Sequence, residues 1–235
     1  MQNCIIASTS TIHGSSYLEY LFEPLKKLWN GIDEILFIPY ARPSGISHDA
    51  YTAIVSEALQ KLNKKVTGIH THANPVEAIA KAKAIFTGGG NTFVLVNALY
   101  KNELLTPIKK AIQSGTPYLG TSAGSNISGL TMQTTNDMPI VRPPSYQTMG
   151  ILPFNINPHY QDPDPSSTHK GETRETRIKE YHAYNTVPVI GLREGSWLRI
   201  AEKEIYLRGG LSARIFEQGK APYELENGKS LSKLH

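Results

Sequence analysis

The first half of the chain alternates short apolar runs with longer amphipathic segments, and this alternation constrains the fold more than any other feature. The apolar, strand-like runs occupy residues 3–8, 34–40, 65–70, 84–89 and 117–122. The amphipathic segments between them occupy residues 17–29, 49–62, 75–82, 91–101 and 107–114. Alternating strands and helices predict a doubly wound α/β fold, with a mostly parallel sheet and helices on both of its faces. Ligand-binding loops then belong at the carboxyl ends of the strands.

Helix periodicity and helix caps support this assignment. In the segment 49–62, six apolar side chains recur at the spacing of one helical face: Tyr51, Ile54, Val55, Ala58, Leu59 and Leu62. Asn74 precedes Pro75 and stands three residues before Glu77, which predicts a capped helix start with proline at the first helical position. Thr106-Pro107 and Gly115 mark the two ends of the predicted helix over residues 107–114 in the same way.

The pattern changes after about residue 130, where prolines and polar residues replace the long apolar faces. We expect short strands and functional loops there. A helix follows over residues 172–184 and a strong apolar strand over 187–192. The runs 196–200, 204–209 and 213–218 predict short antiparallel strands at the sheet edge or in a C-terminal hairpin. No internal repeat or linker separates two parts, so the expectation is a single domain over residues 1–235.

Composition narrows the class of protein. The chain has 235 residues, of which 40% are hydrophobic and 19% charged, an ordinary balance for a soluble protein. Its formal net charge of +4 comes from scattered basic pairs rather than a stripe, so we expect no nucleic-acid partner. Cys4 is the only cysteine, which excludes a disulfide within the chain. With neither a secretory signal pattern nor an apolar run of about 18 residues, we expect no membrane association and a cytoplasmic location.

The motif "GTSAG" places Ser122 between Gly120 and Gly124. Small neighbours permit a sharp turn that presents a serine hydroxyl, although a plain tight turn has the same pattern. A serine nucleophile needs a base to take its proton and an acid to orient that base. The best contexts belong to His159, in "NINPHYQDP", and to Glu194, at the end of the apolar strand in "VPVIGLREGSW". A turn histidine and a solvated rim glutamate are the competing interpretations.

The triglycine in "TGGGNTF" follows a predicted strand and opens a predicted helix. Its amides suit either a phosphate cradle or an oxyanion hole. The motif is neither a Walker loop nor a complete dinucleotide fingerprint, so we favour an oxyanion hole formed by Gly89, Gly90 and the amide of Ala123. His70 and His72 have no carboxylate or thiol at a convincing metal-ligand spacing, so we expect no metal and no cofactor.

Six separated motifs, in order, resemble the aspartyl dipeptidase family, peptidase E: "FTGGGNTF", "GTSAGSNI", "TTNDMPI", "INPHY", "HKGETRETRI" and "VIGLREGSW". The resemblance covers essentially the whole chain. It implies a fold akin to the class I glutamine amidotransferases and a serine exopeptidase that cleaves Asp-X dipeptides and short peptides after an N-terminal aspartate. Carried onto the matching positions, Ser122 is the nucleophile, His159 the base and Glu194 the triad acid. Arg174 corresponds to the arginine that recognises aspartate, and Asp137 to a residue that positions substrate or supports the site.

Two positions depart from the family pattern. Position 193 is arginine where the family commonly has proline, and the segment between His159 and Gly171 is slightly longer than usual.

Alternative functions stay open at this point. An α/β-hydrolase esterase shares the serine motif but has the chain order serine, acid, histidine, which would require an earlier acid such as Asp162. A cyanophycinase-like peptidase and a non-catalytic phosphate- or nucleotide-binding module are the other candidates. A homodimer is a possible assembly.

Overall fold

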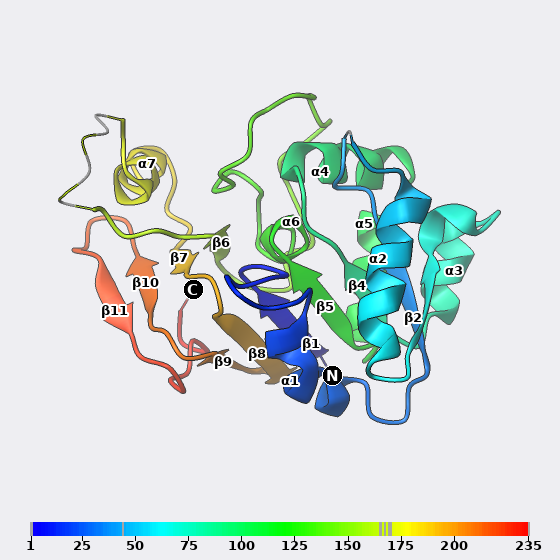
Figure 1. The fold of residues 1–235 in the computed structure, drawn as a ribbon. Coiled ribbons are helices and arrows are strands. Elements are labelled where there is room, and N and C mark those ends of the chain that lie inside the picture. Colours follow the sequence, from blue (N-terminus) through cyan, green and yellow to red (C-terminus); the bar gives the residue numbers. More distant parts are fainter. Residues whose placement is uncertain (1, 44, 165, 167, 169–170, 235) are drawn as a thin grey trace.

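A seven-stranded sheet forms the centre of the computed structural model, which describes residues 2–43, 45–164, 166, 168 and 171–234 (Figure 1). The strand order is β3-β2-β4-β5-β1-β8-β9. The bounds are Gln2–Ala7 (β1), Glu34–Ile38 (β2), Lys65–Gly68 (β3), Ile85–Thr87 (β4), Tyr118–Thr121 (β5), Trp197–Glu202 (β8) and Glu204–Arg208 (β9). β1 to β5 run parallel, whereas β8 and β9 are antiparallel at one edge. The predicted α/β class with a mostly parallel main sheet is confirmed.

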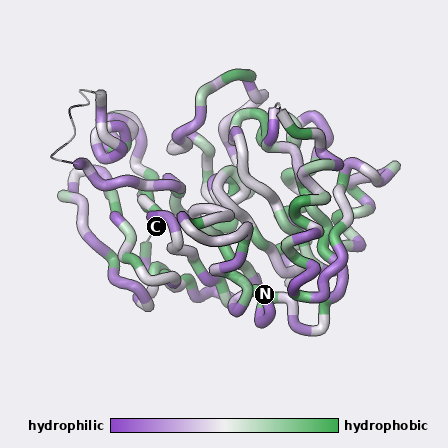
Figure 2. The backbone as a smooth tube through the Cα atoms, in the orientation of Figure 1, coloured by the Kyte–Doolittle hydropathy of each residue, from purple (hydrophilic) through white to green (hydrophobic). Residues whose placement is uncertain are grey.

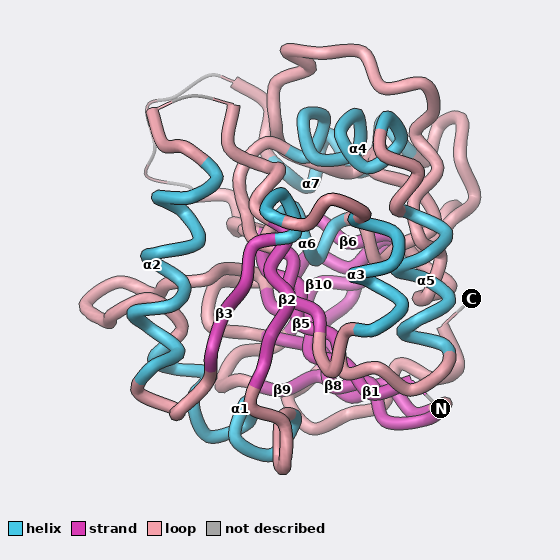
Figure 3. Tube along the Cα trace, turned by 90° about the vertical axis from the view of Figure 1, so that its right-hand side faces the viewer, coloured by secondary structure: helices cyan, strands magenta, loops and turns pink. Residues whose placement is uncertain are grey.

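Helices cover both faces of this sheet, as the alternation predicted. Their bounds are Phe22–Leu28 (α1), His48–Gln60 (α2), Pro75–Lys81 (α3), Thr92–Lys101 (α4), Leu105–Gln113 (α5), Ala123–Asn126 (α6) and Arg174–Tyr181 (α7), with 3-10 turns at Glu19–Leu21 and Ile69–Thr71. The view in Figure 3 shows α2 on one side of the central strands and α3 and α5 on the other. The two faces of the sheet are therefore both removed from solvent.

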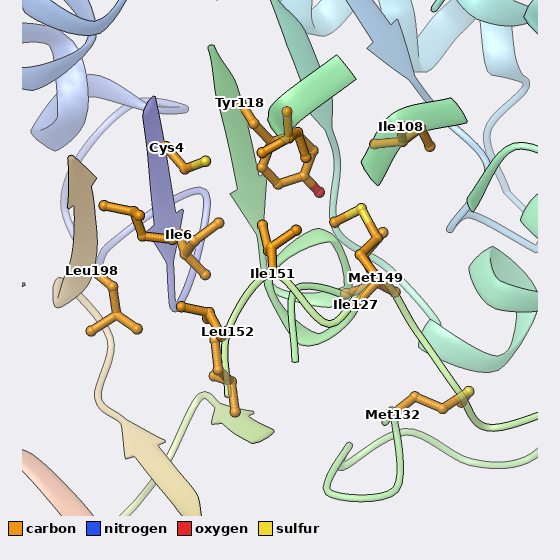
Figure 4. Packing of buried hydrophobic residues seen from close by; sticks show 14 of the residues in the cluster. Cys4, Ile6, Ile108, Tyr118, Ile127, Met132, Met149, Ile151, Leu152 and Leu198 are labelled. Carbon is orange, nitrogen blue, oxygen red and sulfur yellow. The ribbon is translucent and has the colours of Figure 1, made fainter. Parts of the chain in front are cut away.

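Two hydrophobic clusters result from the alternation of side chains along each strand. In β1, Ile6 packs into the cluster that also holds Leu152 and Met149, whereas its neighbour Ile5 packs into the cluster under α1 and α2. Figure 4 shows part of the first cluster, where side chains from β1, β5, α5 and the segment around Ile151 meet. In Figure 2 the hydrophobic colouring follows the central strands, as two-sided burial requires.

A second sheet lies beside the first, in the order β11-β10-β7-β6. Its strands are Asn155–Pro158 (β6), Val189–Leu192 (β7), Ala213–Phe216 (β10) and Tyr223–Leu225 (β11). β6 and β7 pair in parallel, and the remaining pairs are antiparallel. The sequence predicted one main sheet, with short antiparallel strands at its edge or in a C-terminal hairpin. β8 and β9 do lie at that edge, but the other strands pair among themselves, because local sequence reveals a strand without specifying its partner.

Local details mostly follow the sequence signals. Asn74 accepts a hydrogen bond from the Glu77 amide at 3.1 Å, so the predicted cap of α3 is confirmed. Ile54 is an exception, because its side chain is 43% exposed although the periodicity placed it on the buried face of α2. It lies about 80° around the helix from the centre of the buried stripe formed by Tyr51, Val55, Ala58 and Leu59, and so it reaches solvent.

His169 and Lys170, in the motif "HKGETRETRI", lie outside the described residues. None of the described helices has the length and apolar character that would let it cross a membrane. The grouping with class I glutamine amidotransferases, the single domain and the homodimer stay predictions.

Candidate active site

Ser122 occupies the sharp turn between β5 and α6, at the carboxyl edge of the main sheet. Its backbone is strained, with φ 53° and ψ −111°. The flanking glycines are required by close packing, because a Cβ atom on Gly120 would meet the Gly124 carbonyl oxygen at 2.5 Å. A Cβ atom on Gly124 would meet the Thr87 carbonyl oxygen at 2.1 Å. The motif "GTSAG" thus lets a serine reach solvent from a turn too tight for larger neighbours.

His159 follows β6 directly and also has a positive φ, 54°. Its Nε2 atom lies 2.9 Å from the Ser122 Oγ atom. Buried Ser8, just beyond the end of β1, holds the histidine backbone, because the His159 amide donates to the Ser8 hydroxyl at 2.9 Å. That hydroxyl donates in turn to the Leu192 carbonyl oxygen at 2.7 Å, so Ser8 links the ends of three strands in two sheets.

Glu194 follows β7, and its Oε1 atom lies 2.6 Å from His159 Nδ1. A carboxylate at this position accepts a hydrogen bond from the Nδ1–H group, which favours the tautomer whose unprotonated Nε2 can accept the Ser122 proton. The structure therefore brings together the three side chains that the sequence singled out. Asp162, the acid that the esterase alternative requires, instead binds Arg193 through both carboxylate oxygens, at 2.7 and 2.8 Å.

Arg193 anchors the segment that carries Glu194. Besides Asp162, its guanidinium contacts both oxygens of Glu224, at 2.9 and 3.0 Å, and lies 5.6 Å from the ring centroid of Tyr160. These hydrogen bonds raise the pKa of Arg193 and hold the pKa values of both carboxyl groups below their ordinary range. Arg193, at the position that departs from the resemblance, therefore bonds to the segment after His159 and to β11.

The triglycine loop lies against Ser122. A Cβ atom on Gly89 would meet the Ser122 Cβ at 3.0 Å, and Gly90 has a φ of 144° with the Ala41 carbonyl pressed against it. Neither the Gly89 nor the Gly90 amide donates a hydrogen bond to any residue that the structure describes. Ala123 begins α6, so its amide has no helical carbonyl partner. Of the predicted oxyanion-hole amides, those of Gly89 and Ala123 thus neighbour the serine, whereas Gly90 packs against Ala41.

Arg174 begins α7 and is half-buried beside a depression of about 360 Å³ that Asp162, Gly171 and Arg177 also line. Its guanidinium makes no hydrogen bond or ion pair within the described ranges. Burial and the neighbouring Arg177 lower its pKa, and Asp137 acts in the opposite direction. A partly desolvated arginine without a carboxylate partner is suited to bind an anionic group of a ligand.

Asp137 belongs to the loop beside the start of α4. One carboxylate oxygen, Oδ2, accepts hydrogen bonds from the Thr92 amide at 2.7 Å and from the Thr135 hydroxyl at 2.9 Å. Its other oxygen, Oδ1, has no hydrogen-bond donor among the described residues. Asp137 therefore holds the helix that follows the glycine loop and keeps one oxygen available.

His70 and His72, the pair considered as metal ligands, have different surroundings. His70 Nε2 lies 2.8 Å from Asp49 Oδ1, whereas His72 lines a groove between α3 and β2. Within the described part of the chain, no group of three or more histidine, cysteine, aspartate or glutamate side chains is arranged to hold a metal ion.

Ser8 is a site residue that the sequence reasoning missed. Its only signal is its place at the carboxyl end of the first strand, where ligand-binding loops of parallel sheets gather.

Comparisons with known proteins identify the family of the chain. Residues 4–208 match the model of peptidase family S51. The chain is 47% identical to peptidase E of Streptomyces coelicolor over 99% of this chain and 94% of that protein. It is 44% identical to a probable alpha-aspartyl dipeptidase of Drosophila melanogaster over 95% and 93% of the two chains. These relatives confirm the predicted peptidase class.

Two solved structures share the fold. A putative peptidase E from Listeria monocytogenes superposes with a TM-score of 0.68 at 22% identity, covering 89% of this chain and 98% of that one. A peptidase from an acI-B1 actinobacterium superposes with a TM-score of 0.73 at 20% identity, covering 98% and 96%. With the family match extending over most of its length, the chain belongs to peptidase family S51.

Proposed function

We propose that the chain is a serine dipeptidase that hydrolyses the peptide bond after an N-terminal aspartate. The observation that carries the proposal is the continuous relay from Ser122 Oγ to His159 Nε2, at 2.9 Å, and from His159 Nδ1 to Glu194, at 2.6 Å. Membership of family S51 and the names of the relatives support the same activity.

In the first half of the reaction, Ser122 Oγ attacks the carbonyl carbon of aspartate while His159 Nε2 takes the hydroxyl proton. Glu194 holds the ring and stabilises the imidazolium. Collapse of the tetrahedral intermediate breaks the C–N bond, and the imidazolium gives its proton to the departing amine. Water then repeats the sequence on the acyl-enzyme, which releases aspartate and restores the Ser122 hydroxyl.

The negative oxygen of the intermediate needs donors that are already in place. The amides of Ala123 and of Gly89 or Gly90 meet this need, because Ala123 and Gly89 adjoin Ser122 and none of the three amides donates to a described group. One such donor typically contributes about 10²- to 10³-fold in rate.

Selectivity for aspartate rests on Arg174, whose unpaired guanidinium binds the substrate side-chain carboxylate with two parallel hydrogen bonds. Asp137 contributes electrostatically at Arg174, so the two groups are close enough to share one substrate residue. Its available Oδ1 oxygen receives the free α-ammonium group, which limits the enzyme to N-terminal residues.

The test is hydrolysis of Asp-Leu, Asn-Leu and N-acetyl-Asp-Leu by the protein, by Ser122→Ala and by Arg174→Gln. We expect rapid cleavage of Asp-Leu alone, and no cleavage by Ser122→Ala. Arg174→Gln should lose about 10- to 150-fold in kcat/KM on Asp-Leu, the value of one charge-assisted hydrogen bond. Cleavage of Asn-Leu as fast as Asp-Leu, or full activity of Ser122→Ala, would contradict the proposal.

A further inference from the structure

Arg42 is a second unpaired arginine at this end of the main sheet, and nothing in the sequence analysis singled it out. It follows β2, again at the carboxyl edge of the main sheet, and its side chain is exposed. Its backbone is fixed beside the triglycine loop, because the preceding carbonyl, of Ala41, accepts the Asn91 amide at 2.7 Å and packs against Gly90. Arg42 thus belongs to the wall of the site.

Three successive contacts lead from Arg42 to Ser122. The Arg42 guanidinium lies 5.0 Å from the ring centroid of buried Tyr51, whose hydroxyl donates to the Gly89 carbonyl at 3.2 Å. Gly89 in turn contacts Ser122. Burial raises the pKa of the nearby Tyr17 hydroxyl, and the Arg42 charge opposes this rise.

No carboxylate within the described residues neutralises Arg42 through an ion pair or hydrogen bond. Stacking on Tyr51 limits the orientations of the guanidinium plane and leaves its N–H edge available. Two acidic side chains of neighbouring segments have other partners. Asp49 is held by His70, and Asp137 by Thr92 and Thr135.

The segments that carry the two unpaired arginines lie on opposite sides of α6, the helix that follows Ser122. In Figure 1, α7, which begins with Arg174, lies on one side of α6, and the β2–α2 loop, which contains Arg42, lies on the other. An Asp-X dipeptide has the same arrangement of charge. Its aspartate carboxylate belongs to the acyl side of the scissile bond, and its C-terminal carboxylate lies one residue beyond, on the leaving-amine side.

We infer that Arg42 binds the C-terminal carboxylate of the substrate and so makes this enzyme select dipeptides with a free carboxyl end. The inference rests on the proposed function. It assigns Arg42 a specificity role that is separate from the role of Arg174, because Arg42 binds the C-terminal carboxylate and Arg174 binds the aspartate side chain.

The experiment compares kcat/KM on Asp-Leu and on its C-terminal amide, Asp-Leu-NH2, for the protein and for Arg42→Gln and Arg42→Lys. The unchanged protein should prefer Asp-Leu by about tenfold or more, which corresponds to one charge-assisted hydrogen bond. Arg42→Gln should lose this factor on Asp-Leu and cleave the amide at the original rate. Arg42→Lys should keep an intermediate preference, because it retains the charge and loses the planar fork.

Lys203→Gln is the matched control, because it removes one positive charge from the exposed β8–β9 turn. That turn lies at the end of the main sheet away from Ser122, because Glu202 pairs with Gln2 at the amino end of β1. We expect its activity on both substrates to stay unchanged.

Equal losses on the two substrates by Arg42→Gln, or no loss on either, would overturn the inference. So would a loss of the preference for Asp-Leu over Asn-Leu, which would assign Arg42 to the aspartate side chain. Failure of the unchanged protein to cleave Asp-Leu at all is a different outcome, and it would reject the proposed dipeptidase function itself.

Discussion

Replacement of Ser8 by alanine tests whether the junction of the two sheets holds His159, the proposed catalytic base, in place. The Ser8 side chain is fully buried. Its hydroxyl accepts the His159 amide at 2.9 Å and donates to the Leu192 carbonyl at 2.7 Å. Alanine keeps the Cβ atom and removes one oxygen, so lost hydrogen bonds rather than a lost hydrophobic contact dominate the effect.

The expected cost follows from these two bonds. Leu192 keeps a second donor, the Tyr160 amide at 3.1 Å, but the His159 amide loses the partner that Ser8 provides. A net hydrogen bond contributes about 0.5–1.5 kcal/mol, and a buried amide left unpaired costs about 1–3 kcal/mol. We therefore expect the free energy of unfolding to fall by about 2 kcal/mol, measured by urea denaturation with an unchanged m-value.

Ser128 provides a matched control, because it is equally buried and its hydroxyl has no hydrogen-bond partner among the residues that the structure describes. Ser128→Ala removes a desolvated hydroxyl without breaking a bond, so the free energy of unfolding should change by less than about 0.5 kcal/mol or rise.

Activity on Asp-Leu gives the functional readout. Ser8→Ala should lower kcat, because His159 has a strained φ of 54° and the Ser8 bond helps to hold that conformation. Ser128→Ala should keep full kcat. The reasoning is refuted if Ser8→Ala costs no more stability than Ser128→Ala, or if it costs stability and leaves kcat unchanged.

Two further changes probe the site walls. Gly89→Ala should lower kcat on Asp-Leu by about 10- to 100-fold with little change in Tm. The new Cβ atom would lie 3.0 Å from the Ser122 Cβ atom and displace that serine. An unchanged kcat would disprove this. Arg193→Met should lower the free energy of unfolding most near pH 7. Arg193 lowers the pKa values of Asp162 and Glu224, so the ionised carboxylates stabilise the fold above about pH 4, and this stabilisation is lost as the pH falls. Equal differences in unfolding free energy at pH 7 and pH 3 would contradict that account.

Much of the site was predictable because its signals are local. The glycines around Ser122 are required by atoms within a few residues or by the adjacent strand, and their pattern is therefore visible in the sequence. The contexts of His159 and Glu194 were also informative, since both follow apolar strands. Their distances to Ser122 were not predictable, because they depend on two sheets meeting at one edge.

The Arg193 contacts illustrate what local sequence does not determine. Arg193 was noted only as a departure from a family pattern, yet it joins Asp162 and Glu224, each 31 positions away. Ion pairs between exposed-looking residues leave no periodic signal, so only the folded chain reveals them. The same applies to Arg42. In the sequence it has the pattern of a solvated loop residue, and only the packing of Ala41 against Gly90 shows that it lies beside the glycine loop.

By itself, the sequence determined the alternation of strands and helices, the two-sided main sheet, the glycine turns and the candidate nucleophile, base and acid. These properties depend on backbone conformation and on hydrophobic period, which neighbouring residues specify. The tertiary structure alone decided that residues 155–158, 189–192, 213–216 and 223–225 form a separate sheet, and that Ser8 ties the two sheets together beneath His159. Strand partners and long-range hydrogen bonds are chosen by the packing of the whole chain, because many pairings satisfy the same local pattern.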